Sequence, residues 1–418
     1  MKLKHKAIIL VWTAALVLLP TLSASAAVSL NINDRSYQAL NSPIMQDDRV
    51  STTLDVLIDT IGCDISVQDK TITLKENQNT LIMNLGSKTA LYNGLELTMP
   101  FPPQMFGDQI YVPVRFVYET LGATVNWEEK TNTVKIDYNE TRNGMTAEDI
   151  VLKSSDKAKQ AGRYKMFTNA KYDINMTMQE SGKNPETIKA TSDSEITAWY
   201  QIQPILMYIK QKAVVTTAGV EAAGPETVET ETLLNENGMY IKMPETGWVK
   251  MDLPGINLQT LMKQSMNQDP ATAMQQMKDT GMSLALANDQ EKNGSKYWVI
   301  DSKMGSEFFK SDYFKQMMGQ MKGTAGEMDM QQMFEAIEMD MSYSSWINQE
   351  TMDNNYLLLK AKIKMPVNIP STPDNAAGKM DMDMGIIADY AISDYGKPFT
   401  VPDITGAKSM SEIAPKVK

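Results

Sequence analysis

The stretch Asp108-Gln-Ile-Tyr-Val-Pro-Val-Arg-Phe-Val-Tyr-Glu-Thr-Leu-Gly-Ala-Thr-Val-Asn-Trp127 decides the first part of the fold. Pro113 suits a first helical turn, and Gly122 stands where a helix ends in a left-handed residue. A polar turn at 128–132 then separates two β-like segments. The stretch therefore predicts a helix followed by a β-hairpin. The apolar residues of the helix recur at helical spacing, at Val114, Val117, Tyr118 and Leu121.

An internal repeat extends this unit to the preceding residues. Residues 48–74 can be laid over residues 108–136 at a starting offset of 60, which places Gly62 on Gly122. Thr52 with Asp55 resembles a capping box before the first helix. The duplication predicts a domain built from one small unit used twice. The helical apolar residues of the first copy are Leu54, Leu57, Ile58 and Ile61.

The second copy resembles the signature of the copper amine oxidase N-terminal-like domain, also called a stalk domain. The resemblance covers about residues 30–138 and lies in Tyr-Val-Pro-x-Arg-Phe at 111–116, Leu-Gly-Ala at 121–123 and Trp127. It implies a non-catalytic extracellular appendage of Firmicutes. Arg115 is expected to snorkel or to pair at the surface of the module. Trp127 is expected to fill the core between helix and hairpin, and stacking of a carbohydrate on its ring is the alternative.

Residues 1–27 are typical of a secretory signal peptide, with three early lysines, an apolar run of about 12 residues and a small-residue site at Ala24-Ser-Ala26. The run is too short to span a bilayer as a helix. Cleavage would remove His5, the single histidine, and the loss of Lys2, Lys4 and Lys6 would take the formal net charge from −11 to −14. So acidic a chain disfavours nucleic acid and anionic lipid surfaces as partners.

The sequence of the mature chain lacks histidine, and no Ser–Lys or paired-carboxylate arrangement stands out in it. Without histidine, neither a Ser-His-Asp nor a Cys-His arrangement can form, and an amine oxidase would lack its copper ligands. Cys63 is alone in the sequence, so it forms no internal disulfide, and it is too far from the signal to be a lipobox cysteine. There is also no Gly-rich phosphate loop. We therefore expect no catalytic residues, no metal site and no cofactor.

Residues 139–145 are polar and are predicted as a linker to a second domain at 146–405, followed by a tail at 406–418. A capped helix is predicted from Thr146 to Gly162. Alternating apolar and polar residues then predict an antiparallel sheet with one wet side, and Asn235-Glu-Asn-Gly238 predicts a hairpin. The alternating segments are 172–178, 239–243, 339–343, 357–365 and 380–386. Helical inserts are predicted at about 258–277, 309–321 and 330–337.

This order of elements resembles the LolA-like lipoprotein-carrier superfamily, and more closely an uncharacterised lipoprotein-like Firmicutes domain. The resemblance covers roughly 146–405 and lies in 154–165, in Gly-Met-Tyr-Ile-Lys-Met-Pro-Glu-Thr-Gly-Trp-Val-Lys-Met at 238–251, and in Ser-Lys-Tyr-Trp-Val-Ile at 295–300. It implies a curved half-barrel closed by helices over an apolar cavity that holds lipid or acyl chains. The predicted fold class is thus α+β, with a duplicated helix-plus-hairpin module followed by a curved antiparallel β half-barrel with helical inserts.

The 33 methionines admit three interpretations. They fill cores, they line an adaptable apolar pocket, or they bind Cu(I) through Met-x-Met spacings. We predict a secreted, cell-wall-associated binding protein whose stalk domain positions a half-barrel near a wall polymer. A structural protein with a filled core is the alternative, and Met-based Cu(I) binding is the third. The predicted ligand-binding residues are Ile174, Met176, Met178, Met339, Met341, Leu357, Leu359, Met382 and Met384.

Overall fold

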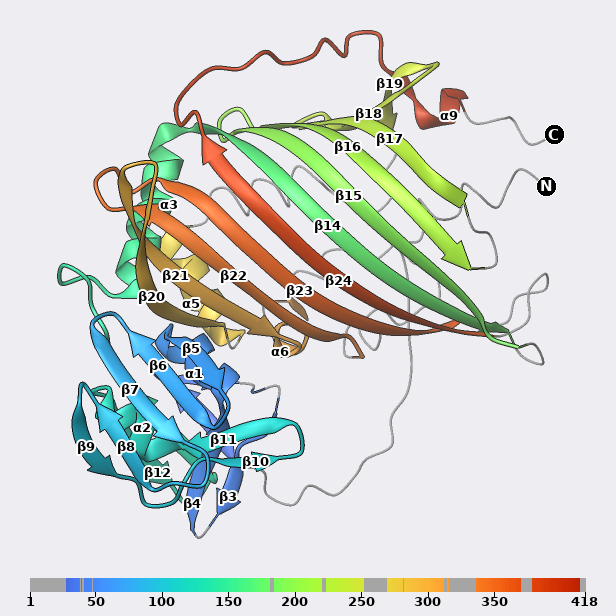
Figure 1. Ribbon diagram of the computed structural model, residues 1–418. Helices are drawn as coiled ribbons and strands as arrows, with labels where there is room; N and C mark the ends of the chain where they lie inside the picture. The colour runs from blue at the N-terminus through green and yellow to red at the C-terminus, as the bar shows by residue number, and fades with distance from the viewer. Residues whose placement is uncertain are drawn as a thin grey trace.

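The computed structural model is built mainly of strands, arranged as a small N-terminal domain beside a large curved sheet (Figure 1). It describes residues 28–37, 39, 41–46, 48–180, 184–219, 223–251, 269–280, 282–311, 314–315, 336–369 and 378–413. The predicted signal peptide lies outside these residues. So does most of the three predicted helical inserts. None of the helices in the described ranges is both long and apolar enough to cross a membrane.

The N-terminal domain repeats a helix followed by a hairpin, as the internal repeat predicts. In the first copy α1 leads into β5 and β6, and in the second α2 leads into β12 and β13. The elements are β1 (Ser29–Ile32), β2 (Arg35–Tyr37), β3 (Ile44–Gln46), β4 (Arg49–Thr53), α1 (Leu54–Ile61), β5 (Asp64–Gln68), β6 (Thr71–Glu76), β7 (Asn79–Asn84), β8 (Thr89–Tyr92), β9 (Leu95–Thr98), β10 (Gln104–Phe106), β11 (Gln109–Pro113), α2 (Val114–Thr120), β12 (Thr124–Glu128) and β13 (Thr133–Asp137).

Three small sheets enclose the core of this domain. Their strand orders are β12-β13-β1-β2, β10-β11-β4-β3 and β5-β6-β7-β8-β9, and β1 joins β13 in parallel. The two copies meet where the Tyr118 hydroxyl lies 2.5 Å from Oγ1 of Thr60, both buried. Most of the helical apolar residues of both copies, Leu57 and Val117 among them, are buried in one core. Leu54 is half-buried, and Ile58 is 40% exposed, so the predicted apolar face of α1 is only partly buried. The repeat therefore packs as one unit, with its two helices facing a shared interior.

Some details of this domain differ from the sequence-based expectations. Thr53, rather than Thr52, is the N-cap of α1, and Pro113 ends β11 just before α2 begins. Gly62 ends α1 at a φ of +74° as predicted. Trp127 does not fill the core, because its side chain is 37% exposed. Its strand partner Val134 is buried, so the indole lies at the edge of the core rather than inside it.

The C-terminal domain opens with α3 (Ala147–Ala161), whose N-terminus carries the predicted capping box between Thr146 and Asp149. Its other elements are β14 (Arg163–Glu180), β15 (Glu186–Gln201), β16 (Leu206–Gly219), β17 (Ala223–Asn235), β18 (Gly238–Met243), β19 (Gly247–Met251), α5 (Pro270–Asp279), β20 (Ser283–Lys292), β21 (Ser295–Gly305), α6 (Glu307–Lys310), β22 (Glu338–Asn348), β23 (Asn354–Ile369), β24 (Gly378–Ser393), β25 (Lys408–Ser409) and α9 (Met410–Ile413). The predicted hairpin at 235–238 joins β17 to β18.

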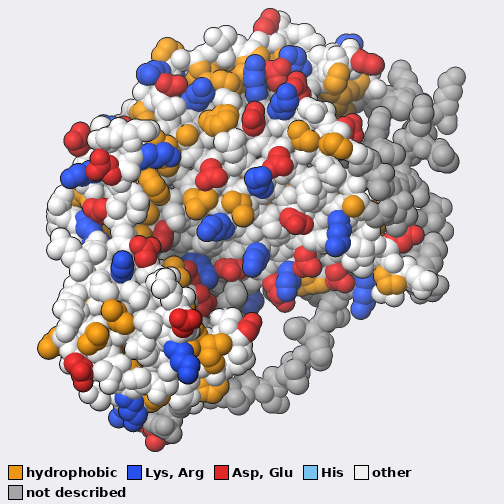
Figure 2. All heavy atoms as spheres, in the orientation of Figure 1, with side chains coloured by type: hydrophobic (Ala, Val, Ile, Leu, Met, Phe, Trp, Pro, Cys, Tyr) orange, Lys and Arg blue, Asp and Glu red, His pale blue; other side chains and the backbone are white. Residues whose placement is uncertain are grey.

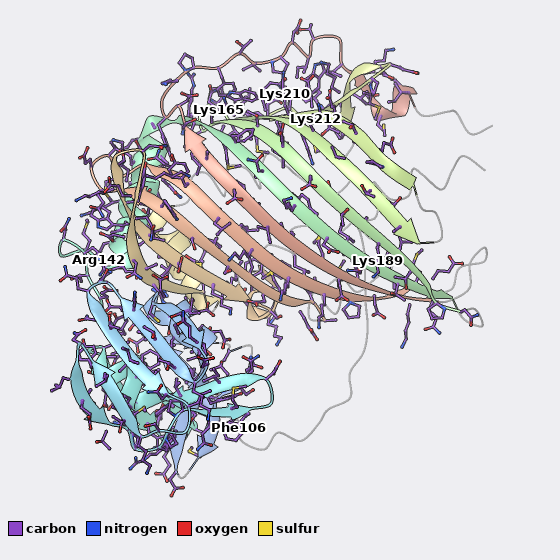
Figure 3. The ribbon with its side chains drawn as sticks, viewed as in Figure 1. Phe106, Arg142, Lys165, Lys189, Lys210 and Lys212 are labelled. Carbon is purple, nitrogen blue, oxygen red and sulfur yellow. The ribbon has the colours of Figure 1, made fainter. Side chains whose placement is uncertain are left out.

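The large sheet has twelve strands among the described residues, in the order β20-β21-β22-β23-β24-β14-β15-β16-β17-β18-β19-β25. Helix α3 packs on one face of it, here called the inner face, where Ile150 contacts Trp298 and Ile300. The opposite, outer face carries interspersed lysines and acids (Figure 2). Lys165, Lys189, Lys210 and Lys212 mark its extent over β14 to β16 (Figure 3). Over β14, β24, β23 and β22 the alternating segments therefore place apolar side chains on the inner face and charged side chains on the outer face.

The C-terminal segment crosses the outer face at the far end of the sheet. Phe399, Ile404 and Ala407 pack on an aromatic cluster that includes Tyr208 and Tyr240. The segment then adds β25, which pairs in parallel with β19. Residues 408–413, inside the predicted tail, therefore contribute a strand and a short helix rather than a free end.

The two domains are in direct contact. Helix α1 packs beside the edge strand β20. Lys303 of β21 donates to Oδ2 of Asp59 at 2.5 Å, with both side chains largely buried, and Tyr37 donates to the same oxygen at 2.6 Å. Asn288 of β20 donates to Asp64 at 2.6 Å. These contacts fix the N-terminal domain against the outer face and edge of the sheet.

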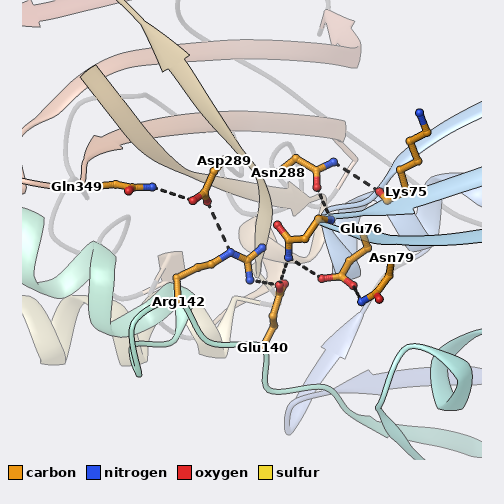
Figure 4. A network of polar contacts seen from close by, with 9 residues as sticks. Lys75, Glu76, Asn79, Glu140, Arg142, Asn288, Asp289 and Gln349 are labelled. Atoms are coloured by element: carbon orange, nitrogen blue, oxygen red, sulfur yellow. Dashed lines mark hydrogen bonds and ion pairs between the residues drawn. The ribbon is translucent and has the colours of Figure 1, made fainter. Parts of the chain in front are cut away.

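The segment predicted as a linker takes part in this interface. Arg142 pairs with Glu140 and lies 3.6 Å from Asp289, which accepts a hydrogen bond from Gln349 (Figure 4). Asn77 of the N-terminal domain donates to Glu140 at 2.6 Å. Residues 139–145 thus contact both the N-terminal and the C-terminal domain.

Candidate functional site

The nine predicted ligand-binding residues all lie on the inner face of the sheet. Partners opposite each other in an antiparallel ladder point to the same face, so the registers place them. Ile174 pairs with Met384, and Met384 pairs with Ile363, which pairs with Met339. These four side chains form one apolar row across β14, β24, β23 and β22. Met176 pairs with Met382 in the next row.

The remaining predicted residues belong to neighbouring rows of the same face. Met178 pairs with Met380 beyond the first two rows. In the other direction Met341 pairs with Ala361. Leu359 and Leu357 lie further along β23, opposite Ala388 and Tyr390. The sequence-based selection therefore forms a band over four adjacent strands that extends from the Met178 row to the Leu357 row.

Burial distinguishes this band from the cores of the protein. All nine side chains are half-buried. By contrast, Leu57, Ile72 and Met83 of the N-terminal core are fully buried. Ile300 and Ile347, under α3 at the other end of the inner face, are also within 1% of complete burial. The band is thus apolar surface that the described side chains cover only in part.

The outer face opposite the band is polar and paired. Lys171 lies 2.9 Å from Asp193, and Lys364 lies 3.6 Å from Glu338. These exposed ion pairs contribute little stability each, but they keep one side of the long strands hydrated. A register slip by one residue would move the methionines into water, so the sidedness also fixes the strand pairing.

The tyrosine hydroxyls on the inner face stay uncharged near neutral pH. The Tyr343 hydroxyl donates to the sulfur of Met282 at 2.9 Å. Burial raises the pKa of Tyr343, and it also raises the pKa of Tyr172 and of Tyr390 on the neighbouring strands. Their phenols therefore remain protonated. The exposed Glu186 lies opposite Met178 at one end of the band. In the described ranges, no group of three or more His, Cys, Asp or Glu side chains is placed to hold a metal ion.

Several other apolar side chains of the inner face were not among the nine predicted residues. Ile363, Met365 and Met380 share rows with the predicted residues, and Met304 lies opposite Met341. Ile188 of β15 extends the Met176 row beyond β14. Ile363, Met365 and Met380 stand in alternating segments already recognised. Ile188 lies in a strand rich in Thr and Ser, whose pattern carries little signal until its partner is known.

Comparison with known proteins identifies both domains. The family model described as the copper amine oxidase N-terminal domain matches residues 31–136. The model of a family of unknown function, DUF6612, matches residues 146–406, which is more than half of the chain. No curated protein matches the chain.

The similar solved structures align with low scores. LprF from Mycobacterium bovis is 14% identical over 62% of this chain and 96% of its own, with a TM-score of 0.26. The lipoprotein LppX from Mycobacterium tuberculosis is 11% identical over 61% and 98%, with a TM-score of 0.25. A LolA superfamily protein from Nitrosomonas europaea is 11% identical over 62% and 96%, with a TM-score of 0.16. These scores are too low to support a functional conclusion. On its family match, the chain belongs to the DUF6612 family of unknown function and carries a copper amine oxidase N-terminal domain ahead of the family's own region.

Proposed function

We propose that the C-terminal domain binds an apolar ligand, a lipid or another acyl compound, on the methionine-rich band of its inner face. The observation that carries the proposal is the half-buried state of Ile174, Met339, Met382 and their neighbours on a face whose helix-covered end is fully buried. Apolar surface of this kind is stabilised when a ligand removes it from water, by about 25 cal/mol per Å². Ligand pockets are likewise lined mainly by apolar side chains.

The composition of the band fits a chain-like ligand of variable shape. Methionine is unbranched and flexible, and its thioether adapts to irregular apolar partners. The band covers four strands spaced about 5 Å apart and extends along them from the Met178 row to the Leu357 row, so it is longer along the strands than across them. A flexible acyl chain can follow such a surface more readily than a rigid ring system.

The N-terminal domain would position this binding face in the cell envelope. The signal-like residues 1–27 support export, and the acidic mature chain disfavours nucleic acid as a partner. In this proposal the protein is secreted, acts without catalysis, and is held near a wall polymer through its first domain. The domain contacts along β20 and β21 would keep the sheet at a set orientation to that attachment.

The test is native mass spectrometry of protein purified from its own host, with lipid extraction of the same sample. Co-purifying acyl species that leave on denaturation would support the proposal and name the ligand class. Protein found free of ligand, which also fails to take up a fluorescent fatty acid, would contradict it and favour a filled core.

Substitution then locates the ligand. Met382→Lys with Met384→Lys places two charges on the inner face, and uptake of the fluorescent fatty acid should be lost. The matched control is Asp381→Lys with Asp383→Lys, which places the same side chains on the outer face of the same strand. Uptake should survive the control. Equal uptake by both double variants would remove the band as the site.

A further inference from the structure

A cavity lies on the N-terminal domain, away from the large sheet. It has a volume of about 620 Å³ and is formed by both copies of the repeat. The β3–β4 hairpin supplies Arg49, helix α2 supplies Arg115 and Phe116, and β12 supplies Trp127. Figure 1 shows that β3, β4, α2 and β12 lie on the side of the domain opposite the sheet. The domain contact therefore leaves this cavity open.

The cavity combines an apolar floor with an aromatic wall. Phe101 and Val125 are buried at its base. The indole of Trp127 is 37% exposed, although it projects from the same side of β12 as buried Val125. A large aromatic ring left open beside an apolar floor costs free energy unless a ligand covers it. Its flat face can stack on a ring that presents C–H groups.

The rim carries polar groups of both signs. Arg115 and Glu119 form an exposed ion pair with a separation of 3.2 Å, and Arg49, Asp48 and Asn126 also line the opening. Two guanidinium groups and two carboxylates leave the rim without a dominant charge. The electrostatics therefore favour neither an anion nor a cation. They suit an uncharged ligand with many hydroxyl or amide groups, because donors and acceptors stand side by side.

The two copies of the repeat have diverged at these positions. Val67 of the first copy corresponds to Trp127, and Asp55 corresponds to Arg115. The first copy uses its helix α1 to contact β20. In the second copy, the helix and hairpin face the cavity instead. Trp127 and Arg115 thus belong to the second copy, whose helix and hairpin face the cavity rather than the neighbouring domain.

We infer that this cavity binds a sugar unit of a polysaccharide, with the pyranose ring stacked on Trp127 and its hydroxyl or acetamido groups on Arg115, Glu119 and Asn126. The inference rests on the proposed function in one respect, since it names the chemical class through which the N-terminal domain would hold the protein at the wall. A cavity of this volume accommodates a ligand of one or two rings.

The test uses the full chain and two probes, soluble chito-oligosaccharides and purified peptidoglycan. Trp127→Ala and, separately, Arg115→Ala should each weaken oligosaccharide binding in calorimetry by about tenfold, a change of about 1.4 kcal/mol. Co-sedimentation with peptidoglycan should fall in parallel. The control is Phe106→Ala, which removes another exposed aromatic ring of the same domain, on the β10–β11 hairpin outside the cavity (Figure 3). Its binding should match the unaltered protein.

Three results would overturn the inference. These are the absence of binding to both probes, binding unaffected by the Trp127 and Arg115 substitutions, and binding at this cavity of an apolar dye or peptide but of no saccharide. Because Trp127→Ala could also loosen the domain, Trp127→Phe is measured beside it and should retain most of the affinity. Fatty-acid uptake by the same variants should be unchanged. Loss of saccharide binding with uptake retained therefore separates this site from the inner face.

Discussion

Gly62 and Gly122 offer a matched pair for testing the domain contact. They occupy the same place in the two copies of the repeat, and both have a positive φ, +74° and +93°. An alanine at either position would carry the strain of the left-handed conformation, about 1–2 kcal/mol. Their surroundings differ. A Cβ on Gly62 would lie 2.5 Å from the carbonyl oxygen of Leu286 in β20, whereas no described atom lies within 4 Å of one on Gly122.

The size of the additional effect follows from the interface. Relief of the clash to an ordinary contact of 3.4 Å requires an opening of about 0.9 Å between α1 and a strand backbone that cannot rotate away. Such an opening strains the bonds from Ser283 and Lys303 to Asp59 and from Asn288 to Asp64. One neutral and two charged hydrogen bonds contribute roughly 4–7 kcal/mol together if all are lost. We therefore expect Gly62→Ala to lower the free energy of unfolding by about 1–2 kcal/mol through backbone strain. Weakening of these hydrogen bonds should lower it further, by a substantial part of their combined contribution.

The assay is chemical denaturation of both variants together with hydrogen exchange followed by mass spectrometry. Gly122→Ala should lower the free energy of unfolding only by the strain of its backbone conformation. The amides of β20 should keep the protection from exchange that they have in the unaltered protein. Gly62→Ala should show faster exchange in both 54–61 and 283–292, because the contact between them opens. Equal losses of stability in the two variants, with β20 protected in both, would refute the docked arrangement of the domains.

Two further predictions concern a buried thiol of the N-terminal domain and the buried ion pair between the two domains. Burial raises the pKa of Cys63 to about 12, so this thiol makes the folded state lose about 1.4 kcal/mol per pH unit as pH rises from about 9 towards 12. Buried tyrosines with a raised pKa add to the loss above about pH 10. Denaturation of both proteins at several alkaline pH values should therefore show a slope that is smaller in Cys63→Ala by the contribution of the thiol. Lys303→Met should cost about 3–5 kcal/mol, because it leaves the buried Asp59 carboxylate without its cation. Adding Asp59→Leu should restore more than half of that loss in a double-mutant cycle, and strictly additive losses would argue against the pair.

The sequence allowed the wet and dry sides of the sheet to be predicted where alternation is strong. The methionines of 172–178 and 380–386 stand two residues apart between polar neighbours, so their common face follows from strand geometry alone. The long strands β15 and β16 were harder to predict. Their Thr, Ser and Ala residues occupy both faces, and periodicity does not reveal that β15 pairs with β14 and β16 with β15.

The contact between the domains could not be predicted from sequence. Asp59 and Lys303 are separated by 244 residues, and neither stands in a pattern that marks a buried pair. The exposure of Trp127 was also beyond sequence reasoning. Alternation with Val125 places the ring on the core side of its strand, but whether the core extends that far depends on how the two copies pack.

The ends of the large sheet have a consequence for the behaviour of the protein in solution. A long sheet that finishes in open strands presents unpaired backbone groups, which can recruit a strand from another molecule. Here β25 pairs with β19 at one end, and at the other end Gly62 lies close to the backbone of Leu286 in β20. Truncation after residue 405, or removal of the first domain, should therefore turn a monodisperse protein into one that self-associates edge to edge.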